Sequence, residues 1–410
     1  MAEQGIHTML TIKNCSLIDG NGNFEEDVSI LIENNKIKEI GSPEERGRII
    51  DAKGKYVLPG LIDSHLHLAG TRSMNPLDWV LENSALKTIR AVKDVEKLIE
   101  AGFTSVRCAG ISPHSLALRD AVNEGIIKGP RIQAAGRVMS QTGGHGDFHM
   151  LPLEWAKKAE MSCIVDGVDE CRKAARELLR EGVDFIKMCT TGGVLSEKDS
   201  PEQAQFTVEE IKAVAEEAER VNKKVDTHSQ GTEGIRNAVK AGVKNIVHGF
   251  YLDKKTCRMM IENNCVYIPT LSVNYKLFTE GKDFDVPEYG LKKIKKTSEI
   301  HKESIALAYK MGVTIATGTD FIGPELLPHG DNALELELLV EKIGFTEMEA
   351  ITAATKNGAI TMGRNDLGTI EEGKTADMII VNKNPLENIK ILREKKNIEC
   401  VIKGGVIIRK

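Results

Sequence analysis

Short hydrophobic runs and long amphipathic stretches alternate through the middle of the chain. Runs such as 183–189 (VDFIKMC) and 245–250 (NIVHGF) are typical of buried strands, and 206–222 has the periodicity of a helix. Eight such runs occur, at 61–67, 104–110, 131–140, 183–189, 224–229, 245–250, 265–272 and 314–320. Because strands that alternate with helices form parallel sheets, the pattern predicts an α/β fold with a (β/α)8 barrel of the TIM type. A doubly wound open sheet is the alternative.

Both ends of the chain show a different pattern. At 9–57, 376–381 and 398–410, short alternating segments are broken by turn pairs such as Asn34-Asn35 and Gly404-Gly405, which is typical of antiparallel hairpins. Two β-rich flanks can pair into one small domain. We therefore expect a composite β-sandwich domain from 1–58 and 365–410, and a barrel domain from 59–364. The segment 278–290 is the expected long loop beside the active site.

Composition excludes several classes of partner. The 410 residues carry 55 Lys and Arg against 60 Asp and Glu, a net charge of -5, which gives no broad basic field for nucleic acid or an anionic membrane surface. No apolar stretch reaches the roughly 18 residues of a membrane span, and the start MAEQGIHTML lacks a signal-peptide pattern. We expect a cytoplasmic protein. Eight cysteines without CxxC spacing predict small, reduced core residues.

Side chains of the kind that bind metals end several of the predicted strands. His65 and His67 are two residues apart, so both point the same way on a strand and can bind one metal ion. His228, His248 and Asp320 end three further runs. Because the carboxyl ends of barrel strands open onto one face, the pattern predicts a metal site there.

Lys187 is an ionisable residue inside an apolar run, and its position has two interpretations. The long stem of a lysine can bring its ammonium group to water from a buried position. Alternatively, the amine has taken up carbon dioxide to become a carbamate, an anionic ligand able to bridge two metal ions. That chemistry requires a neutral amine, which burial favours.

The segment VLPGLIDSHLHL (57–68), followed by a lysine, two single histidines and an aspartate at successive strand ends, resembles the amidohydrolase superfamily of metal-dependent hydrolases. The resemblance covers essentially the whole chain. TGGHGD (142–147), CTTGGVLS (189–196) and HGDNALELELL (329–339) are similar to the branch of metal-dependent dipeptidases, prolidases and arginine- or lysine-releasing carboxypeptidases, which is related to imidazolonepropionase.

This resemblance implies a binuclear metal centre. It implies that one metal is bound by His65, His67 and Asp320, and the second by His228 and His248, with carboxylated Lys187 as the bridge. Zinc is the expected metal, with Mn²⁺, Co²⁺ and Fe²⁺ as alternatives. A hydroxide held between the metals would attack an amide carbonyl, and Asp320 would carry its proton to the leaving nitrogen.

Four further residues are candidates for substrate contact. His145, in a glycine-rich loop, either contacts the substrate or polarises its carbonyl, or is a loop histidine bonded to the backbone. Gln230 stands where peptidases of this branch often carry Tyr or Gly, which leaves the dipeptide assignment open. Arg107 and Tyr275 either recognise a carboxylate or side chain, or serve as a structural ion-pair partner and a loop anchor.

The leading hypothesis is a binuclear hydrolase of amide bonds that resembles a dipeptidase or carboxypeptidase. Its substrates would be small peptides, such as Xaa-Pro or Xaa-Arg/Lys, or N-acyl amino acids. The alternatives are a hydrolase of cyclic amides or of xenobiotic amides and carbamates, a mononuclear deaminase-like relative, which would lack the bridging lysine, and a non-catalytic scaffold. Members of the superfamily are often homo-oligomers, so the resemblance also implies a homo-oligomer.

Overall fold

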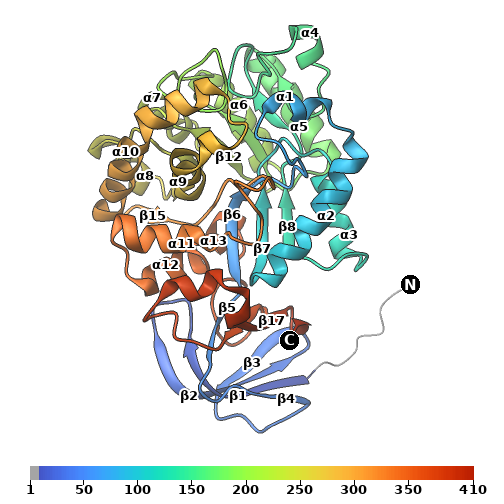
Figure 1. The fold of residues 1–410 in the computed structure, drawn as a ribbon, viewed down its shortest axis with the longest axis vertical. Coiled ribbons are helices and arrows are strands. Elements are labelled where there is room, and N and C mark those ends of the chain that lie inside the picture. Colours follow the sequence, from blue (N-terminus) through green and yellow to red (C-terminus); the bar gives the residue numbers. More distant parts are fainter. Residues whose placement is uncertain (1–8) are drawn as a thin grey trace.

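A computed structural model describes residues 9–410 as a mixed α/β fold with one largely antiparallel sheet and two parallel sheets. In Figure 1 the antiparallel sheet lies below, and the parallel strands lie above it among helices. Residues 1–8, which include part of the predicted first domain and of the segment without a signal-peptide pattern, lie outside the described residues.

The antiparallel sheet is built from both ends of the described chain. Its strands are β1 (Met9–Ile18), β2 (Phe24–Glu33), β3 (Lys36–Gly41), β4 (Arg48–Asp51), β5 (Tyr56–Pro59), β16 (Met378–Val381), β17 (Ile398–Lys403) and β18 (Val406–Arg409). The order is β18-β17-β16-β5-β1-β2-β3, and β4 pairs with β1. The two ends meet where β16 runs antiparallel to β5, with Met378 opposite Pro59. Apolar side chains from both ends, including Ile12 and Ile380, share one core.

The parallel strands lie in two sheets. The first holds β6 (Leu61–Leu66), β7 (Phe103–Cys108) and β8 (Arg131–Ala134). The second has the order β10-β9-β11-β12-β13-β14-β15, from β9 (Val138–Ser140), β10 (Ser162–Ile164), β11 (Ile186–Cys189), β12 (Val225–Ser229), β13 (Asn245–His248), β14 (Val266–Ile268) and β15 (Thr314–Ile315). Each predicted run therefore contains a strand.

Three predicted strands differ from the observed ones. The run 131–140 forms two strands in different sheets, because Gly136 turns the chain with a φ of +65°. The run 265–272 stops at Ile268, since Thr270 adopts the left-handed conformation and a helix begins at Leu271. After β15, the chain leaves its sheet and hydrogen-bonds to β6, through Ser64 N to Thr317 O (2.9 Å) and Asp320 N to His65 O (2.7 Å). This seam joins the two parallel sheets.

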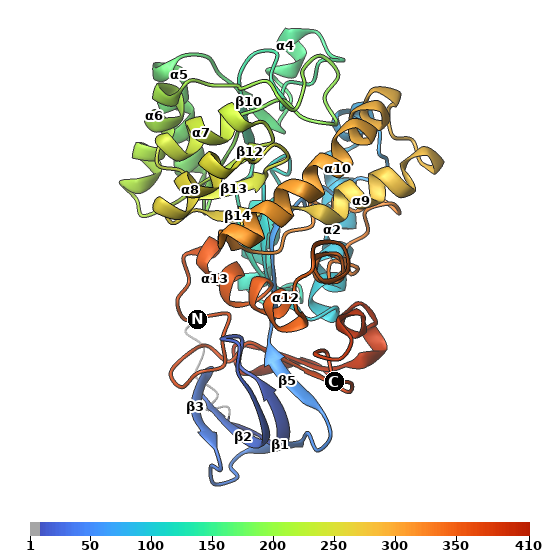
Figure 2. The same ribbon diagram turned by 90° about the vertical axis from the view of Figure 1, so that its left-hand side faces the viewer.

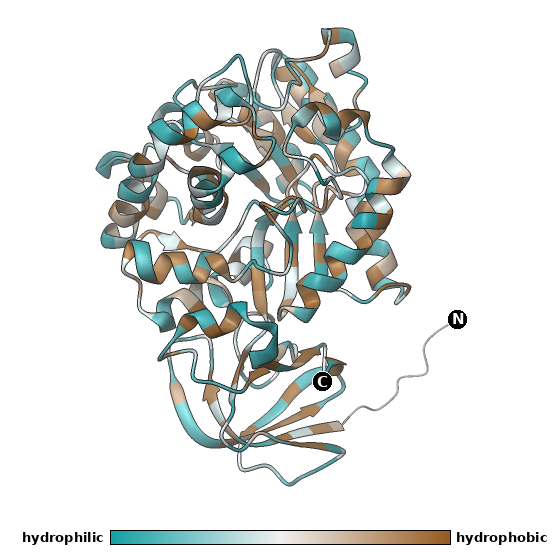
Figure 3. Cartoon of the chain, in the orientation of Figure 1, coloured by the Kyte–Doolittle hydropathy of each residue, from teal (hydrophilic) through white to brown (hydrophobic). Residues whose placement is uncertain are grey.

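Helices surround the parallel strands (Figure 2). They are α1 (Pro76–Leu81), α2 (Ser84–Glu100), α3 (Ser115–Asn123), α4 (Leu153–Ala156), α5 (Val168–Glu181), α6 (Val208–Glu219), α7 (Thr232–Lys240), α8 (Lys254–Glu262), α9 (Leu271–Thr279), α10 (Glu288–Met311), α11 (Leu334–Leu338), α12 (Glu347–Ala353) and α13 (Lys356–Met362). Shorter helical turns are η1 (Gly281–Asp283), η2 (Leu339–Ile343), η3 (Ile389–Arg393) and η4 (Lys395–Asn397). In Figure 3 hydrophobic positions are frequent on the strands, and hydrophilic positions are frequent on the helices around them.

The predicted long loop at 278–290 is largely helical. The helix α9 continues to Thr279, η1 follows at Gly281, and α10 begins at Glu288, so only Glu280 and 284–287 lie outside helices. The loop beside the site is instead 193–199, and Tyr289 of α10 donates a hydrogen bond to its Leu195 carbonyl (3.4 Å). Turn residues in 278–290, among them Gly281 and Gly290, suggested a loop. The prediction failed because both glycines lie in helical turns that the sequence periodicity did not reveal.

Candidate metal centre

The predicted metal-binding residues meet at one end of the parallel strands. Their side chains are all buried or largely buried, and they line one cavity. They come from β6 and the residue after it, from β11, β12 and β13, and from the segment after β15; they are His65, His67, Lys187, His228, His248 and Asp320. The structure therefore brings together residues spread over more than half of the chain.

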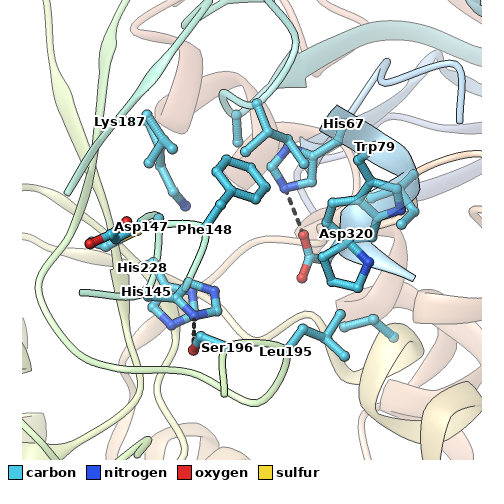
Figure 4. A pocket seen from close by; sticks show the side chains of 18 of the residues that line it. His67, Trp79, His145, Asp147, Phe148, Lys187, Leu195, Ser196, His228 and Asp320 are labelled. Carbon is cyan, nitrogen blue, oxygen red and sulfur yellow. Dashed lines mark hydrogen bonds and ion pairs between the residues drawn. The ribbon is translucent and has the colours of Figure 1, made fainter. Parts of the chain in front are cut away.

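The contacts within this cluster are close. Asp320 Oδ1 lies 2.9 Å from His67 Nε2 and 3.3 Å from His65 Nε2. Lys187 Nζ lies 3.4 Å from His65 Nδ1. One ligand atom from each of His65, His248 and Asp320 lies within 4.8 Å of the others, so this group could hold a metal ion. Figure 4 shows Lys187 pointing into the cavity, and His67 directed at Asp320.

Two of these residues have a strained backbone. His248 and Asp320 have φ angles of +74° and +60°, in the left-handed region that side chains other than glycine rarely adopt. Each such residue costs about 1–3 kcal/mol and persists only where its surroundings fix it. Tyr267 fixes His248 by donating from its hydroxyl to the His248 carbonyl (2.8 Å), and the seam to β6 fixes Asp320. Both residues with this left-handed backbone line the cavity.

Contacts outside the cluster orient the imidazole rings. His67 Nδ1 lies 3.0 Å from Gly110 O, and His248 Nδ1 lies 2.8 Å from Thr270 Oγ1. His228 is oriented through Nε2 instead of Nδ1, because its Nε2 lies 3.1 Å from Gly192 O. Each of these three rings thus has one nitrogen bonded to a group outside the cluster, which is how metal-binding histidines are generally oriented.

The ionisation states suit cation binding. Burial lowers the pKa of His65 to about 3 and those of His228 and His248 well below the usual value, so these rings are neutral at pH 7. Burial also lowers the pKa of Lys187 to about 8. In Asp320, burial raises the pKa, but hydrogen bonds from His65 and His67 outweigh it, so the pKa lies well below the usual value. Neutral imidazoles and an ionised carboxylate are the forms that bind metals.

Asp63 fixes the backbone around the metal cluster through hydrogen bonds, and the sequence analysis did not identify it as a functional residue. Its buried carboxylate accepts hydrogen bonds from Thr319 Oγ1 and Asn332 Nδ2 (both 2.7 Å) and from His65 N (3.0 Å). Burial raises its pKa to about 6. The available signal was an acidic residue inside the apolar run 61–67. Asp63 ties β6 to the segment that carries Asp320.

His145 is held against the cluster by side chains. Its ring stacks on His228 with centroids 4.0 Å apart, and its Nδ1 lies 2.7 Å from Ser196 Oγ. Ser196 donates in turn to Asp199, which Lys293 of α10 contacts at 3.4 Å. Figure 4 shows the His145–Ser196 contact at the cavity wall. A loop histidine satisfied by the backbone would not need these contacts, and the three supporting residues lay outside the sequence prediction.

Replacing His145 with alanine should lower kcat/KM by about 10-fold or more while metal content stays unchanged, since an oriented side chain beside the reacting group is lost. Steady-state kinetics and metal analysis on the same preparation check this. The matched control is His114→Ala, whose ring contacts Leu68 O and does not line the cavity. Loss of metal in the His145 variant would instead make this residue a metal ligand.

Arg107 and Tyr275 do not line the cavity. Arg107 is 1% exposed, pairs with Asp226 (2.6 Å) and lies over the Phe185 ring at 4.0 Å, so its contacts are those of a structural ion pair. Tyr275 packs half-buried against the hydrophobic core. Because α9 begins at Leu271, the helical turn directs Val273 to this cavity and Asn274 to a smaller cavity beside it, and directs the next residue away from both. Neither side chain therefore lies where it would contact a ligand in these cavities.

Arg107→Lys should lower the free energy of unfolding by about 1–2 kcal/mol, because lysine keeps the charge but loses the planar contact with Phe185 and the Nε–H bond to Gln133 (3.0 Å). Urea denaturation measures this change. Arg46→Lys, at an exposed pair with Glu44, is the control. A large rise in KM without loss of stability would restore Arg107 as a substrate contact.

Comparison with known proteins finds a matching family and several similar proteins. Residues 56–408 match the amidohydrolase family. This chain belongs to the amidohydrolase family. It is 33% identical to ochratoxinase of Aspergillus niger over 96% of this chain and 85% of the relative. The crystal structure of that enzyme has a TM-score of 0.91 at 32% identity and covers 98% of this chain and 96% of that chain.

Two further relatives broaden the comparison. A crystal structure of a Xaa-Pro dipeptidase with bound methionine in the active site is 34% identical, with a TM-score of 0.88, and covers 98% of this chain and 100% of that chain. Imidazolonepropionase of Geobacillus kaustophilus is 25% identical over 93% of this chain and 90% of the relative. The predicted superfamily is confirmed, and the amidohydrolase is an enzyme that hydrolyses carbon–nitrogen bonds.

The structure bears on two predictions made from the composition, the state of the cysteines and the lack of a membrane span. The eight cysteines are all free and buried, as expected of core residues. Within residues 9–410, no helix has the length and apolar character needed to cross a membrane.

Proposed function

We propose that this amidohydrolase is a binuclear metal enzyme that cleaves amide bonds in small peptides or N-acyl amino acids, in the manner of a dipeptidase or carboxypeptidase. The observation that carries the proposal is the burial of Lys187 beside His65, within a cluster of four histidines and one aspartate. A mononuclear site has no need of this lysine. The names of two relatives, ochratoxinase and Xaa-Pro dipeptidase, support amide and peptide substrates.

The donor set fits two divalent cations. In the proposed arrangement, His65, His67 and Asp320 would hold one ion, His228 and His248 would hold the other, and carboxylated Lys187 would be a ligand shared by both. Zinc is the proposed metal, because imidazole and carboxylate donors suit it. The pKa of Lys187, lowered by burial to about 8, makes the neutral amine needed for carboxylation accessible near neutral pH.

The side chains of the cluster have separate roles in the proposed reaction. When bound, the metal ions would lower the pKa of water and polarise the scissile carbonyl. Asp320, largely buried and ionised, would accept a proton from the attacking water and deliver it to the leaving nitrogen. His145, fixed by Ser196, orients the substrate amide. Both side chains border the same cavity, so the two tasks act on one bound substrate.

The cavity suits a bulky apolar substituent next to the cleaved bond. It spans about 900 Å³ with its opening to solvent included, and it is walled by Trp79, Phe148, Leu195, Ile322 and Leu327. Aromatic and aliphatic walls favour apolar groups, while the polar cluster at the base fixes the orientation. Figure 4 shows Trp79 and Phe148 facing this space.

The fold proposal follows from the seam between the parallel sheets. We propose that both sheets form one closed (β/α)8 barrel over 59–364, and that the two ends, 1–58 and 365–410, form a β-sandwich domain. We also propose a homo-oligomer, which size-exclusion chromatography with light scattering would test.

The test of the proposed function is metal content per chain, combined with a screen of dipeptides and N-acyl amino acids for released amino acid. About two metals per chain and cleavage of a restricted set of substrates are expected. Two metals without peptide cleavage would favour the second candidate, a hydrolase of cyclic amides or carbamates, which the imidazolonepropionase relative supports. One metal would contradict the binuclear centre and point to a deaminase, and none would point to a scaffold.

A further inference from the structure

Glu335, in α11, is a fully buried carboxylate that the proposed reaction does not use. Its side chain is 0% exposed and lines neither cavity, unlike Gln230, a predicted substrate contact, which lines the smaller one. Burial raises the pKa of Glu335 to about 7. Acidic side chains are almost never fully buried without partners, so the partners of this carboxylate indicate its role.

The hydrogen bonds that this carboxylate accepts come from the first turn of α9. Its Oε1 accepts from the backbone N–H of Leu271 (2.9 Å). Its Oε2 accepts from the backbone N–H (2.7 Å) and from the hydroxyl (2.5 Å) of Ser272. The first N–H groups of a helix have no partner within the helix, and a negative charge beside them is favourable. Glu335 therefore caps α9 from a different helix.

This cap leaves the hydroxyl of Thr270 available for another contact. Thr270 directly precedes α9, where a threonine hydroxyl commonly accepts from the first N–H groups of the helix. Thr270 makes no such bond, and its Oγ1 instead lies 2.8 Å from Nδ1 of His248. Its backbone is left-handed, with a φ of +54°, a conformation that persists only where the surroundings fix it. Glu335 fixes the two residues that follow.

The contacts of Glu335 thus lead to a proposed metal ligand. In the tautomer with its proton on Nδ1, the His248 ring donates to the Thr270 hydroxyl and leaves Nε2 for a metal ion. Partners of this kind fix the tautomer and the orientation of a metal-binding ring. Because Glu335 holds the turn that carries this partner, its influence reaches the metal centre without a direct contact.

The motif that contains Glu335 also contacts the residues proposed for the first ion. His329 Nε2 lies 3.1 Å from the carbonyl of His67. Asn332 Nδ2 donates to Asp63 (2.7 Å), which fixes the backbone of the same strand. One short segment therefore contacts the supports of both ions, and Glu335 is its contact on the side of the second ion.

We propose that Glu335 is a positioning residue for the second metal ion, and that it acts on His248 through Thr270. This inference rests on the proposed binuclear centre, in which His228 and His248 would hold the second ion. Without the cap, the first turn of α9 loosens and the Thr270 hydroxyl no longer orients the ring. The second ion is then bound more weakly, while the first ion keeps its ligands.

The test measures a Kd for each bound ion. Equilibrium dialysis of the full-length enzyme against buffered Zn²⁺ gives these values, and His248→Ala identifies the Kd of the second ion. The nearly isosteric Glu335→Gln should raise this Kd by about 10-fold or more, since loss of a group that orients a metal ligand costs about 10–100-fold. The Kd of the first ion should change much less. An equal rise in both values, or no rise in the second, would overturn the positioning role.

The control variant is Glu217→Gln. It removes another buried carboxylate, which pairs with Arg172 (2.7 Å) and lies outside both cavities. Both Kd values should stay at those of the wild type. Weakening of the second ion in this variant as well would show that any loss of a buried charge has the effect, and would overturn the specific role of Glu335.

A second variant distinguishes positioning from a general effect on folding. Thr270→Val removes the hydroxyl beside His248 with little change of shape, and it should weaken the same ion. Combined with Glu335→Gln, it should weaken that ion no further than the more affected single variant, because both substitutions act on one ring. Additive effects on the Kd would show that Glu335 does not act through Thr270, and would contradict the proposal.

The ¹⁵N signals of the His248 ring provide a readout that needs no metal ion. In the full-length chain labelled with ¹⁵N-histidine, Glu335→Gln and Thr270→Val should both shift the signals that His248→Ala removes. If the wild-type chain binds fewer than two ions, the binuclear centre fails, and these signals decide the positioning role separately. Unchanged signals in Glu335→Gln would overturn it.

Discussion

Replacing Lys187 with alanine is expected to remove the second metal ion and to lower turnover by more than about 100-fold. Loss of a group that merely orients a metal ligand costs about 10–100-fold, and a bridging ligand should cost more. The side chain is 3% exposed, and its Nζ lies beside His65 at the base of the cavity. Metal analysis and steady-state kinetics measure the two effects.

Chemical rescue separates a carbamate from an ordinary lysine. Short carboxylic acids such as acetate and propionate should restore part of the activity of Lys187→Ala, because they supply the missing anionic oxygens in the vacated space. The matched control is Lys244→Ala, an exposed lysine whose Nζ donates to Asn263 O (2.8 Å) away from the cavity. Unchanged metal content and turnover in the Lys187 variant would refute the bridging role.

Asp320→Asn is expected to slow hydrolysis by at least about 100-fold, the lower end of contributions from general acid–base groups. The amide oxygen of asparagine can still accept hydrogen bonds from His65 and His67, so the fold and much of the metal affinity should survive. An amide cannot take up the proton of the attacking water at neutral pH. Single-turnover kinetics and circular dichroism would separate the catalytic defect from misfolding.

The control for Asp320 is Asp283→Asn, an exposed carboxylate in η1 that does not line either cavity. This variant should retain wild-type rates. Near-normal turnover in Asp320→Asn would remove the residue from proton transfer and leave it only a ligand. A loss of all bound metal would show that its charge is required for binding.

The chain pattern predicted the positions of the strands and most of the metal cluster. Burial requires apolar strands, so an ionisable residue at a strand end, such as His228 or Asp320, is conspicuous in the sequence. Parallel strands also place their carboxyl ends together, which predicts that these residues meet without any knowledge of distances. Strand length was predicted less well, because backbone turns such as those at Gly136 and Thr270 are set by local conformation.

Residues that support the cluster could not be predicted in the same way. Asp63 and Asn332 are 269 positions apart and become partners only when the segment after β15 closes against β6. Ser196, Asp199 and Lys293 meet because α10 packs beside the 193–199 loop. No periodic signal marks such pairs, since each depends on how separate elements pack.

The sequence by itself determined the α/β pattern and the identity of the ligand-type residues, because these depend on local periodicity and on residue chemistry. It indicated the superfamily through the resemblance of its motifs to those of known members. The tertiary structure alone decided which polar residues face the cavity. Arg107 ends a strand yet is paired with Asp226, and Tyr275 is one helical position from the cavity-lining Asn274. A side chain's direction follows from strand pleat, helix phase and the packing of distant elements, and these are fixed only when the chain has folded.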